Sequence, residues 1–279
     1  MKIPINIPDI DDEEIRAVRH VLSEKSLTSS SFDGGVHVQQ FEKLVSKFVK
    51  SKFTIAVNSG TSALQASLYA LDIKPGDEVL VPSFTFVATA NSVKAVGAKP
   101  VFVDILRENY TMDPDDLRKK VTKRTKAIIP VHLYGHVAYM EEIIEVAKKN
   151  NLKIIEDASQ SLGSKFKQKH SGTFSNLGCF SFYGTKVMTS GEGGAIVTDE
   201  KNLYEKLKQI RNHGHTKNNL ITRLGLNLRL PEINAAIGKI QMKKLPSFLK
   251  QRKNNAKILT ELLQNCDVVL PKQRKHETL

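Results

Sequence analysis

A lysine and an aspartate stand in the two stretches of this sequence that are best suited to chemistry. Lys186 lies between a short hydrophobic run and the glycine-rich turn Ser190-Gly-Glu-Gly-Gly194, which lets backbone approach a ligand closely. Asp157 ends a second apolar run, Ile154-Ile-Glu156. A lysine that can form a Schiff base and a carboxylate that can hold a pyridinium nitrogen are the protein groups that pyridoxal phosphate (PLP) chemistry needs most. The alternatives are a surface lysine and a carboxylate that caps a turn.

Short β-rich runs alternate with helical stretches between residues 54 and 198. Near-continuous apolar strands separated by helices are typical of a mainly parallel sheet covered on both faces. The pattern therefore predicts an α/β fold, a mainly parallel seven-stranded sheet flanked by helices, in which ligands bind at the carboxyl ends of the strands. We expect strands at 54–57, 78–81, 101–103, 127–131, 153–156, 179–182 and 195–198, and helices at 62–71, 88–96, 114–121 and 140–149.

Helical periodicity also marks both ends of the chain. Amphipathic helices are expected at 10–23 and 38–49, and two long ones at 232–245 and 248–263. Residues 267–271, Asp-Val-Val-Leu-Pro, resemble the start of another strand.

Charge and composition narrow the class of protein without deciding its function. The chain of 279 residues has 42 Lys and Arg against 29 Asp and Glu, a net charge of +13. This charge would attract a polyanion, nucleic acid included, or a nucleotide diphosphate sugar. The basic residues are scattered along helices and no helix-turn-helix is recognisable, which favours a solvated basic surface over nucleic-acid binding.

Location and metal content follow from what the sequence contains. No apolar run approaches the ~20 residues that cross a bilayer, and no signal-peptide pattern opens the chain, so a cytoplasmic protein is expected. Two cysteines, Cys179 and Cys266, exclude a cysteine-rich zinc site. His132 and His136 end a strand without a local carboxylate, so we expect them to be structural and predict no metal.

Two further segments could contact a ligand. Asn58-Ser-Gly-Thr-Ser62 joins a strand to a helix, where free backbone N–H groups bind anions; a simple helix cap would serve the same residues. Phe86 follows another strand and would by itself be assigned to the core.

Taken together, these motifs resemble those of the DegT/DnrJ/StrS sugar aminotransferases, from Ile3-Pro-Ile-Asn6 to about residue 265. The long family pattern SF(H/Y)xxK…GEGG is intact around Lys186. The resemblance implies the large domain of a PLP-dependent transferase of the aspartate-aminotransferase type. Dehydratases of the family carry histidine in place of this lysine, so Lys186 favours transamination.

The resemblance also implies a role for each matching residue. Lys186 and Asp157 are the catalytic pair, and Phe86 stacks on the cofactor ring. Gln160 reaches the cofactor's phenolic oxygen. Asn227, in the segment Gly-Leu-Asn-Leu-Arg, binds the cofactor phosphate of a neighbouring subunit, which implies a homodimer with shared active sites. The phosphate of the same subunit is bound by Gly60, Thr61, Ser62 and Ser181.

The implied function is PLP-dependent transamination of a nucleotide-linked keto sugar, with glutamate or glutamine as donor, in polysaccharide biosynthesis. We expect residues 1–231 to form the PLP-binding large domain with an N-terminal helical arm. Residues 232–279 would form connecting helices and a truncated start of the small C-terminal domain. A catalytically impaired PLP-binding fragment and a different PLP enzyme of the same fold remain alternatives, followed by a regulatory nucleic-acid-binding protein.

Overall fold

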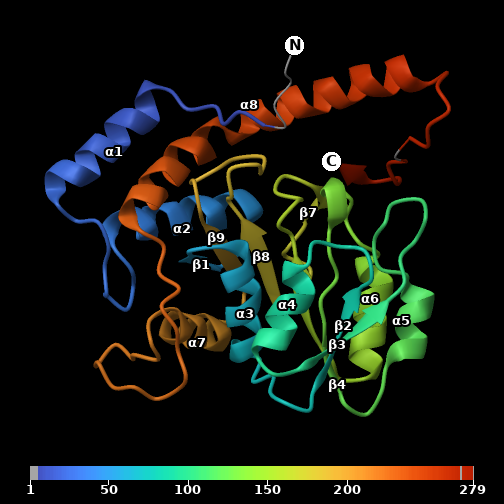
Figure 1. Ribbon diagram of the computed structural model, residues 1–279, viewed down its shortest axis with the longest axis horizontal. Coiled ribbons are helices and arrows are strands. Elements are labelled where there is room, and N and C mark those ends of the chain that lie inside the picture. The colour runs from blue at the N-terminus through green and yellow to red at the C-terminus, as the bar shows by residue number, and fades with distance from the viewer. Residues whose placement is uncertain (1–5, 271, 279) are drawn as a thin grey trace.

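The computed structural model describes residues 6–270 and 272–278, and its centre is a seven-stranded sheet with helices on both faces (Figure 1). The strand order is β1-β9-β8-β5-β4-β2-β3. All neighbouring strands from β8 to β3 are parallel, and β9 runs antiparallel to both β1 and β8. The predicted mainly parallel α/β sheet is confirmed. Its strands are β1 Phe53–Val57, β2 Glu78–Pro82, β3 Lys99–Val103, β4 Thr125–Ile128, β5 Lys153–Asp157, β8 Leu177–Ser181 and β9 Gly194–Thr198.

Alternate strand residues divide the core between the two faces, as the two-residue period of a strand requires. Ile155 of β5 packs with α3 (Gly60–Ala70), α4 (Ala88–Ala95) and α7 (Lys201–Arg211). Its neighbour Ile154 packs on the opposite face with α5 (Pro114–Lys120) and α6 (Met140–Lys149). At the other end of the sheet, that opposite face is covered by α2 (Val36–Val49) and the first half of α8 (Glu232–Leu263).

Helix α8 corrects the expectation of two separate helices. It runs without interruption through Pro246, and it lies against both α2 and α1 (Asp12–Glu24) (Figure 1). A proline removes one backbone hydrogen bond from a helix but does not have to end it. The turns before Pro246 are held by packing, since Met242 and Leu245 are buried in the core with α2. The predicted boundary between domains at residues 231 and 232 stays a prediction.

The expected strand at 267–270 is wrong. These residues form no strand, and Val269 is 88% exposed, so no neighbouring edge pairs with them. The strand lies later, at β10 (Glu277–Thr278), which pairs with β6 (Lys165–Phe166) beside β7 (Lys169–His170). Glu277 anchors it, because its buried carboxylate accepts the N–H of Val137 at 2.7 Å. Pro271 lies outside the described residues.

Over the described ranges, no helix is both long and apolar enough to cross a membrane.

Candidate active site

Lys186 lies in the turn that follows β8 and is half-buried there. Its side chain lines a pocket of about 260 Å³ together with Arg252 of α8 and Asn6 of the N-terminal segment. Burial lowers the pKa of the Lys186 ammonium, and the negative charge of Asp157 partly opposes this shift. The two residues predicted as the catalytic pair therefore lie close enough to act on each other.

Asp157 is the last residue of β5, and its buried carboxylate is held by two donors. The hydroxyl Oγ1 of Thr89 donates to Oδ2 at 2.9 Å, and the backbone N–H of Ser159 donates to Oδ1 at 3.2 Å. Thr89 is fully buried in the first turn of α4. Donors on both oxygens suit an ionised carboxylate, which is purely an acceptor.

Phe86 is joined by its backbone to the turn that holds Asp157. The backbone N–H of Thr89 donates to the Phe86 carbonyl at 3.1 Å, so the residue that holds Asp157 also fixes the turn that carries the ring. The Phe86 side chain is 68% exposed, which excludes the core assignment that its type alone would favour. A largely exposed aromatic ring is thus carried by the turn that also supplies a donor to Asp157.

The start of α3 is capped by a side chain and also has free backbone N–H groups, so it fits both the helix-cap and the anion-binding interpretations of its sequence. Ser59 is the N-cap, and its hydroxyl accepts the Ser62 N–H at 3.0 Å. The backbone N–H groups of Gly60 and Thr61 lie in the first turn, where the helix offers them no carbonyl partner. A helix start of this kind can still bind an anion.

The absence of a side chain at Gly60 leaves room between the start of α3 and two serine hydroxyls. A Cβ at this position would lie 2.8 Å from the Cβ of Ser181 and 3.3 Å from the hydroxyl oxygens of Ser181 and Ser159. The structure thus brings Gly60 of α3, Ser181 of β8 and Ser159 of the loop after β5 to one point. Two hydroxyls beside a helix N-terminus form a suitable cradle for a phosphate group.

Gln160 and Asn227 lie farther out. The side-chain oxygen of Gln160 accepts the N–H of Tyr134 at 3.2 Å, and both residues line a cavity of about 1160 Å³ beside the second half of α8. Asn227 is exposed, and its backbone carbonyl accepts from the Asn58 side chain at 3.5 Å. The cofactor contacts expected for Gln160 and Asn227 stay predictions.

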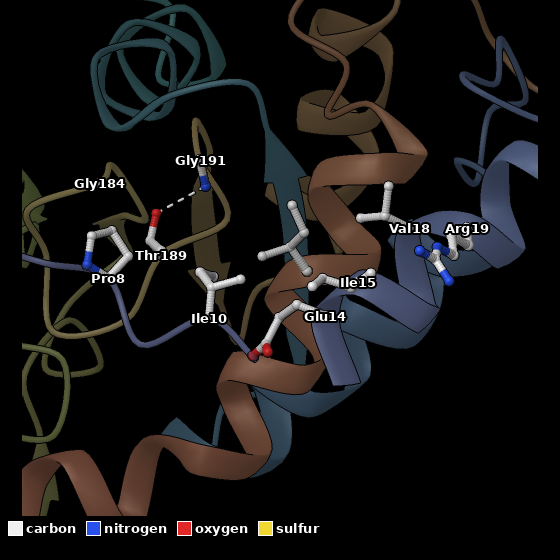
Figure 2. A pocket seen from close by; sticks show the side chains of 10 residues that line it. Pro8, Ile10, Glu14, Ile15, Val18, Arg19, Gly184, Thr189 and Gly191 are labelled. Atoms are coloured by element: carbon white, nitrogen blue, oxygen red, sulfur yellow. Dashed lines mark hydrogen bonds between the residues drawn. The ribbon is translucent and has the colours of Figure 1, made fainter. Parts of the chain in front are cut away.

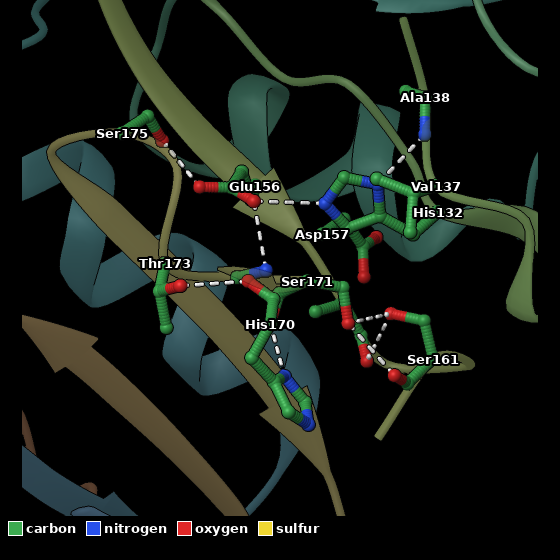
Figure 3. Close-up of polar contacts among 12 residues, drawn as sticks. His132, Val137, Ala138, Glu156, Asp157, Ser161, His170, Ser171, Thr173 and Ser175 are labelled. Carbon is green, nitrogen blue, oxygen red and sulfur yellow. Dashed lines mark hydrogen bonds and ion pairs between the residues drawn. The ribbon is translucent and has the colours of Figure 1, made fainter. Parts of the chain in front are cut away.

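A buried polar network supports the β5 end behind Asp157 (Figure 3). The fully buried Glu156 accepts from Gly172 N–H at 2.7 Å, the Ser175 hydroxyl at 2.8 Å and His132 Nε2 at 2.9 Å. The other ring nitrogen of His132 accepts the Ala138 N–H at 3.0 Å, so the proton of the neutral ring is on Nε2. His132 therefore acts as a structural residue of the site.

Sequence reasoning did not single out Thr89, Ser159 or Glu156. Thr89 stands three residues after Phe86, but nothing in that spacing indicates a bond to Asp157. Their roles arise from contacts between separate elements, so no local pattern announces them. The identifiable residues were those next to a glycine-rich turn or at a strand end.

The residues present fit PLP. A half-buried amine, a buried carboxylate, an exposed aromatic ring and a cradle of helix N–H groups and hydroxyls match its aldehyde, pyridine nitrogen, ring face and phosphate. In each case the match is one of chemical type and of position at one edge of the sheet.

Comparison with known proteins agrees with this chemistry. The model of the DegT/DnrJ/EryC1/StrS aminotransferase family matches residues 8–278. GDP-perosamine synthase of Escherichia coli O157:H7 is 38% identical over 258 residues, which cover 92% of this chain and 70% of that protein. A 3-aminotransferase of Acidithiobacillus ferrooxidans, named for UDP-N-acetyl-3-dehydro-alpha-D-glucosamine, is 40% identical and is covered over 67% of its length, against 88% of this chain.

Solved structures show the same fold. DesV of S. venezuelae superposes with a TM-score of 0.90 at 35% identity, covering 95% of this chain and 71% of that one. A protein of Streptococcus pneumoniae in its PLP-form superposes with a TM-score of 0.89 at 29% identity, covering 95% of this chain and 72% of that one.

Proposed function

Because the chain belongs to the DegT/DnrJ/EryC1/StrS aminotransferase family, whose enzymes use PLP, we propose that it aminates a nucleotide-linked keto sugar with glutamate or glutamine as donor. The observation that carries this proposal at the level of residues is the position of Lys186. Its amine is half-buried, and Asp157 is the group whose charge acts on it.

We assign the cofactor contacts from the geometry described above. Lys186 would hold PLP covalently, and Asp157 would face the ring nitrogen in the orientation set by Thr89. Phe86 offers a ring face for stacking. The N–H groups at the start of α3, with the hydroxyls of Ser159 and Ser181, would hold the phosphate. A phosphate contact of Ser62 stays an expectation from the family resemblance. When bound, PLP supplies an electron-withdrawing ring that stabilises the negative charge left when a proton leaves the donor's α-carbon.

The Lys186 amine is suited to move that proton. Burial lowers its pKa, so a larger fraction of the amine is neutral near neutral pH than for a surface lysine. When the pKa of an amine lies closer to the working pH, its protonated and neutral forms differ less in free energy. Such an amine can both accept a proton and return it. The Asp157 carboxylate, held by Thr89 and Ser159, would face the ring nitrogen and stabilise a positive charge there.

The large cavity beside α8 has the size and charge for a nucleotide sugar. Its volume of about 1160 Å³ is somewhat larger than the roughly 300–1,000 Å³ of common ligand pockets, which leaves room for an extended ligand. Arg252 lines both this cavity and the Lys186 pocket, and Lys250 and Lys253 lie beside it. Tyr110 and Tyr134 provide aromatic surface. We propose that the cations bind the diphosphate and that a tyrosine contacts the base.

A homodimer is part of the proposal. A pocket of about 430 Å³ lies between α1 and the turn after Lys186, lined by Ile10, Ile15 and Val18 (Figure 2). Ile7, Ile10 and Ile15 are exposed around it. A second copy that covers this surface would lie next to the active-site turn. The expected role of Asn227 toward a neighbouring subunit and the cytoplasmic location stay predictions.

The test is an absorbance spectrum of the purified chain with PLP, beside the variant Lys186→Arg. We expect a visible band that depends on Lys186, disappears on addition of L-glutamate and returns with a nucleotide-linked keto sugar. A band that ignores both glutamate and glutamine would support the impaired-fragment alternative. A band restored by a 2-oxo acid but by no keto sugar would indicate a different aminotransferase. Absence of any lysine-dependent band would refute the proposal.

A further inference from the structure

Three potential metal ligands meet where α1 approaches the start of α2, in residues that the proposed reaction does not use. His20 and Glu24 lie one helical turn apart on α1, and His37 is the second residue of α2. One ring nitrogen of each histidine and a carboxylate oxygen of Glu24 all lie within 4.8 Å of one another. We propose that these three side chains form a site for zinc or a similar divalent transition-metal ion.

Each histidine lies near one of the two Glu24 oxygens, at a distance typical of neighbouring ligand atoms around one ion. His20 Nε2 lies 3.2 Å from Glu24 Oε1, and His37 Nε2 lies 3.4 Å from Glu24 Oε2. With metal–ligand bonds of about 2.0–2.1 Å, two ligand atoms of a tetrahedral site lie roughly 3.3 Å apart. Two imidazoles and one carboxylate are a known zinc donor set that leaves the fourth position to water.

The surroundings allow an ion to enter. His20 and Glu24 are exposed, whereas His37 is buried and has a fixed backbone, since its N–H donates to the Glu232 carboxylate at 2.7 Å. Glu232 is buried, so the cluster has a second negative charge nearby. His37 would be a rigid ligand, and the exposed side chains of His20 and Glu24 can rotate to complete the coordination of an ion.

Lys239 opposes the ion and sets its affinity. Its ammonium lies 2.8 Å from His37 Nδ1 and 2.6 Å from Gln40 Oε1. While Lys239 donates to Nδ1, the His37 proton is on Nε2, which faces Glu24. Metal binding through Nε2 needs the opposite tautomer, with the proton on Nδ1. Lys239 must therefore break its hydrogen bond to His37, while its hydrogen bond to Gln40 can remain. Ligating histidines usually give their other N–H to an acceptor, which a lysine does not supply.

A bound ion would tie α1 directly to α2. The N-terminal end of α1 is already joined to α8, because Lys244 lies 2.9 Å from Glu14 and 2.8 Å from Asp11. The helix that lines the pocket beside the active-site turn would then be held near both of its ends (Figure 2).

The experiment is a Zn²⁺ titration of the full chain against a chromophoric chelator, with His20→Ala and Glu24→Gln as variants. Loss of an outer contact at a metal site already weakens binding about 10- to 100-fold, so we expect at least a tenfold loss for each variant. His213→Asn removes an exposed histidine elsewhere and should leave the affinity unchanged. Lys239→Gln, which gives Nδ1–H an acceptor, should tighten binding.

Both surface variants alter exposed residues, so a folding defect cannot imitate the result. Zn²⁺ should also raise the melting temperature of the wild type and not that of His20→Ala. Equal affinity in the wild type, His20→Ala and Glu24→Gln would overturn the site, and so would the absence of binding to the wild type. Unchanged affinity in Lys239→Gln would overturn the role of Lys239.

Discussion

The bond between Thr89 and Asp157 gives the sharpest test of how the site is built. Thr89→Val preserves shape and volume closely but removes the hydroxyl that donates to Asp157 Oδ2 at 2.9 Å. Both side chains are buried, so water cannot replace the donor. A hydrogen bond to a charged group contributes about 1.5–3 kcal/mol, and we expect the free energy of unfolding to fall by about that amount.

Two companion variants separate the bond from the packing. Thr89→Ser keeps the hydroxyl and loses one buried methyl group, which costs about 1 kcal/mol. In an Asp157→Asn background the acceptor is neutral, so the same Thr89→Val change should cost only about 1 kcal/mol. The double-mutant cycle therefore predicts a coupling energy of roughly 1 kcal/mol between the two positions.

Urea unfolding without cofactor measures this coupling in the wild type, Thr89→Val, Asp157→Asn and the double variant. PLP binding, followed by fluorescence, gives a second readout. Thr89→Val should bind PLP more weakly than Thr89→Ser, because the carboxylate loses its fixed orientation. Additive effects within ~0.4 kcal/mol would refute the coupling. Equal PLP affinity in the two variants would refute the positioning argument.

Three further predictions concern the phosphate cradle, the polar network behind Asp157 and the buried His170. Gly60→Ala should weaken PLP binding at least tenfold in a fluorescence titration, since the new Cβ would lie 2.8 Å from the Cβ of Ser181, and unchanged affinity would contradict the cradle. Glu156→Gln should cost about 1 kcal/mol in urea unfolding, because its amide can face Ser175 while its oxygen keeps His132 and Gly172. Glu156→Ala should cost about 3 kcal/mol or more, and equal costs would contradict this account. Burial lowers the pKa of His170 to about 4 from 6.5, so the unfolded chain binds more protons there; stability is full above pH 6.5 and falls as the pH drops toward 4. Between pH 7 and pH 5 this loss is roughly 2 kcal/mol, and it should disappear from the pH profile of His170→Asn.

The sequence alone determined the order of the seven sheet strands, most of the helices and the main chemical groups, but not α7 (Lys201–Arg211) or the continuity of α8. Strand and helix periodicity act over a few residues, so the sheet strands and helix α6 were found to within a few positions. The turn around Lys186 and the strand end at Asp157 were recognisable for the same reason, because glycine-rich turns and apolar runs are local features. Ile3, Pro4 and Ile5, where the family resemblance begins, lie outside the described residues.

Only the tertiary structure decided what these groups touch. Thr89 and Asp157 lie on different elements, and neither residue's neighbours in sequence indicate their bond. Helix α8 continues through Pro246 because α1 and α2 pack against it, which outweighs the local preference of proline for a helix end. Local patterns specify elements because backbone hydrogen bonds join near residues; side-chain contacts between elements depend on how those elements pack, and packing is decided by the whole chain.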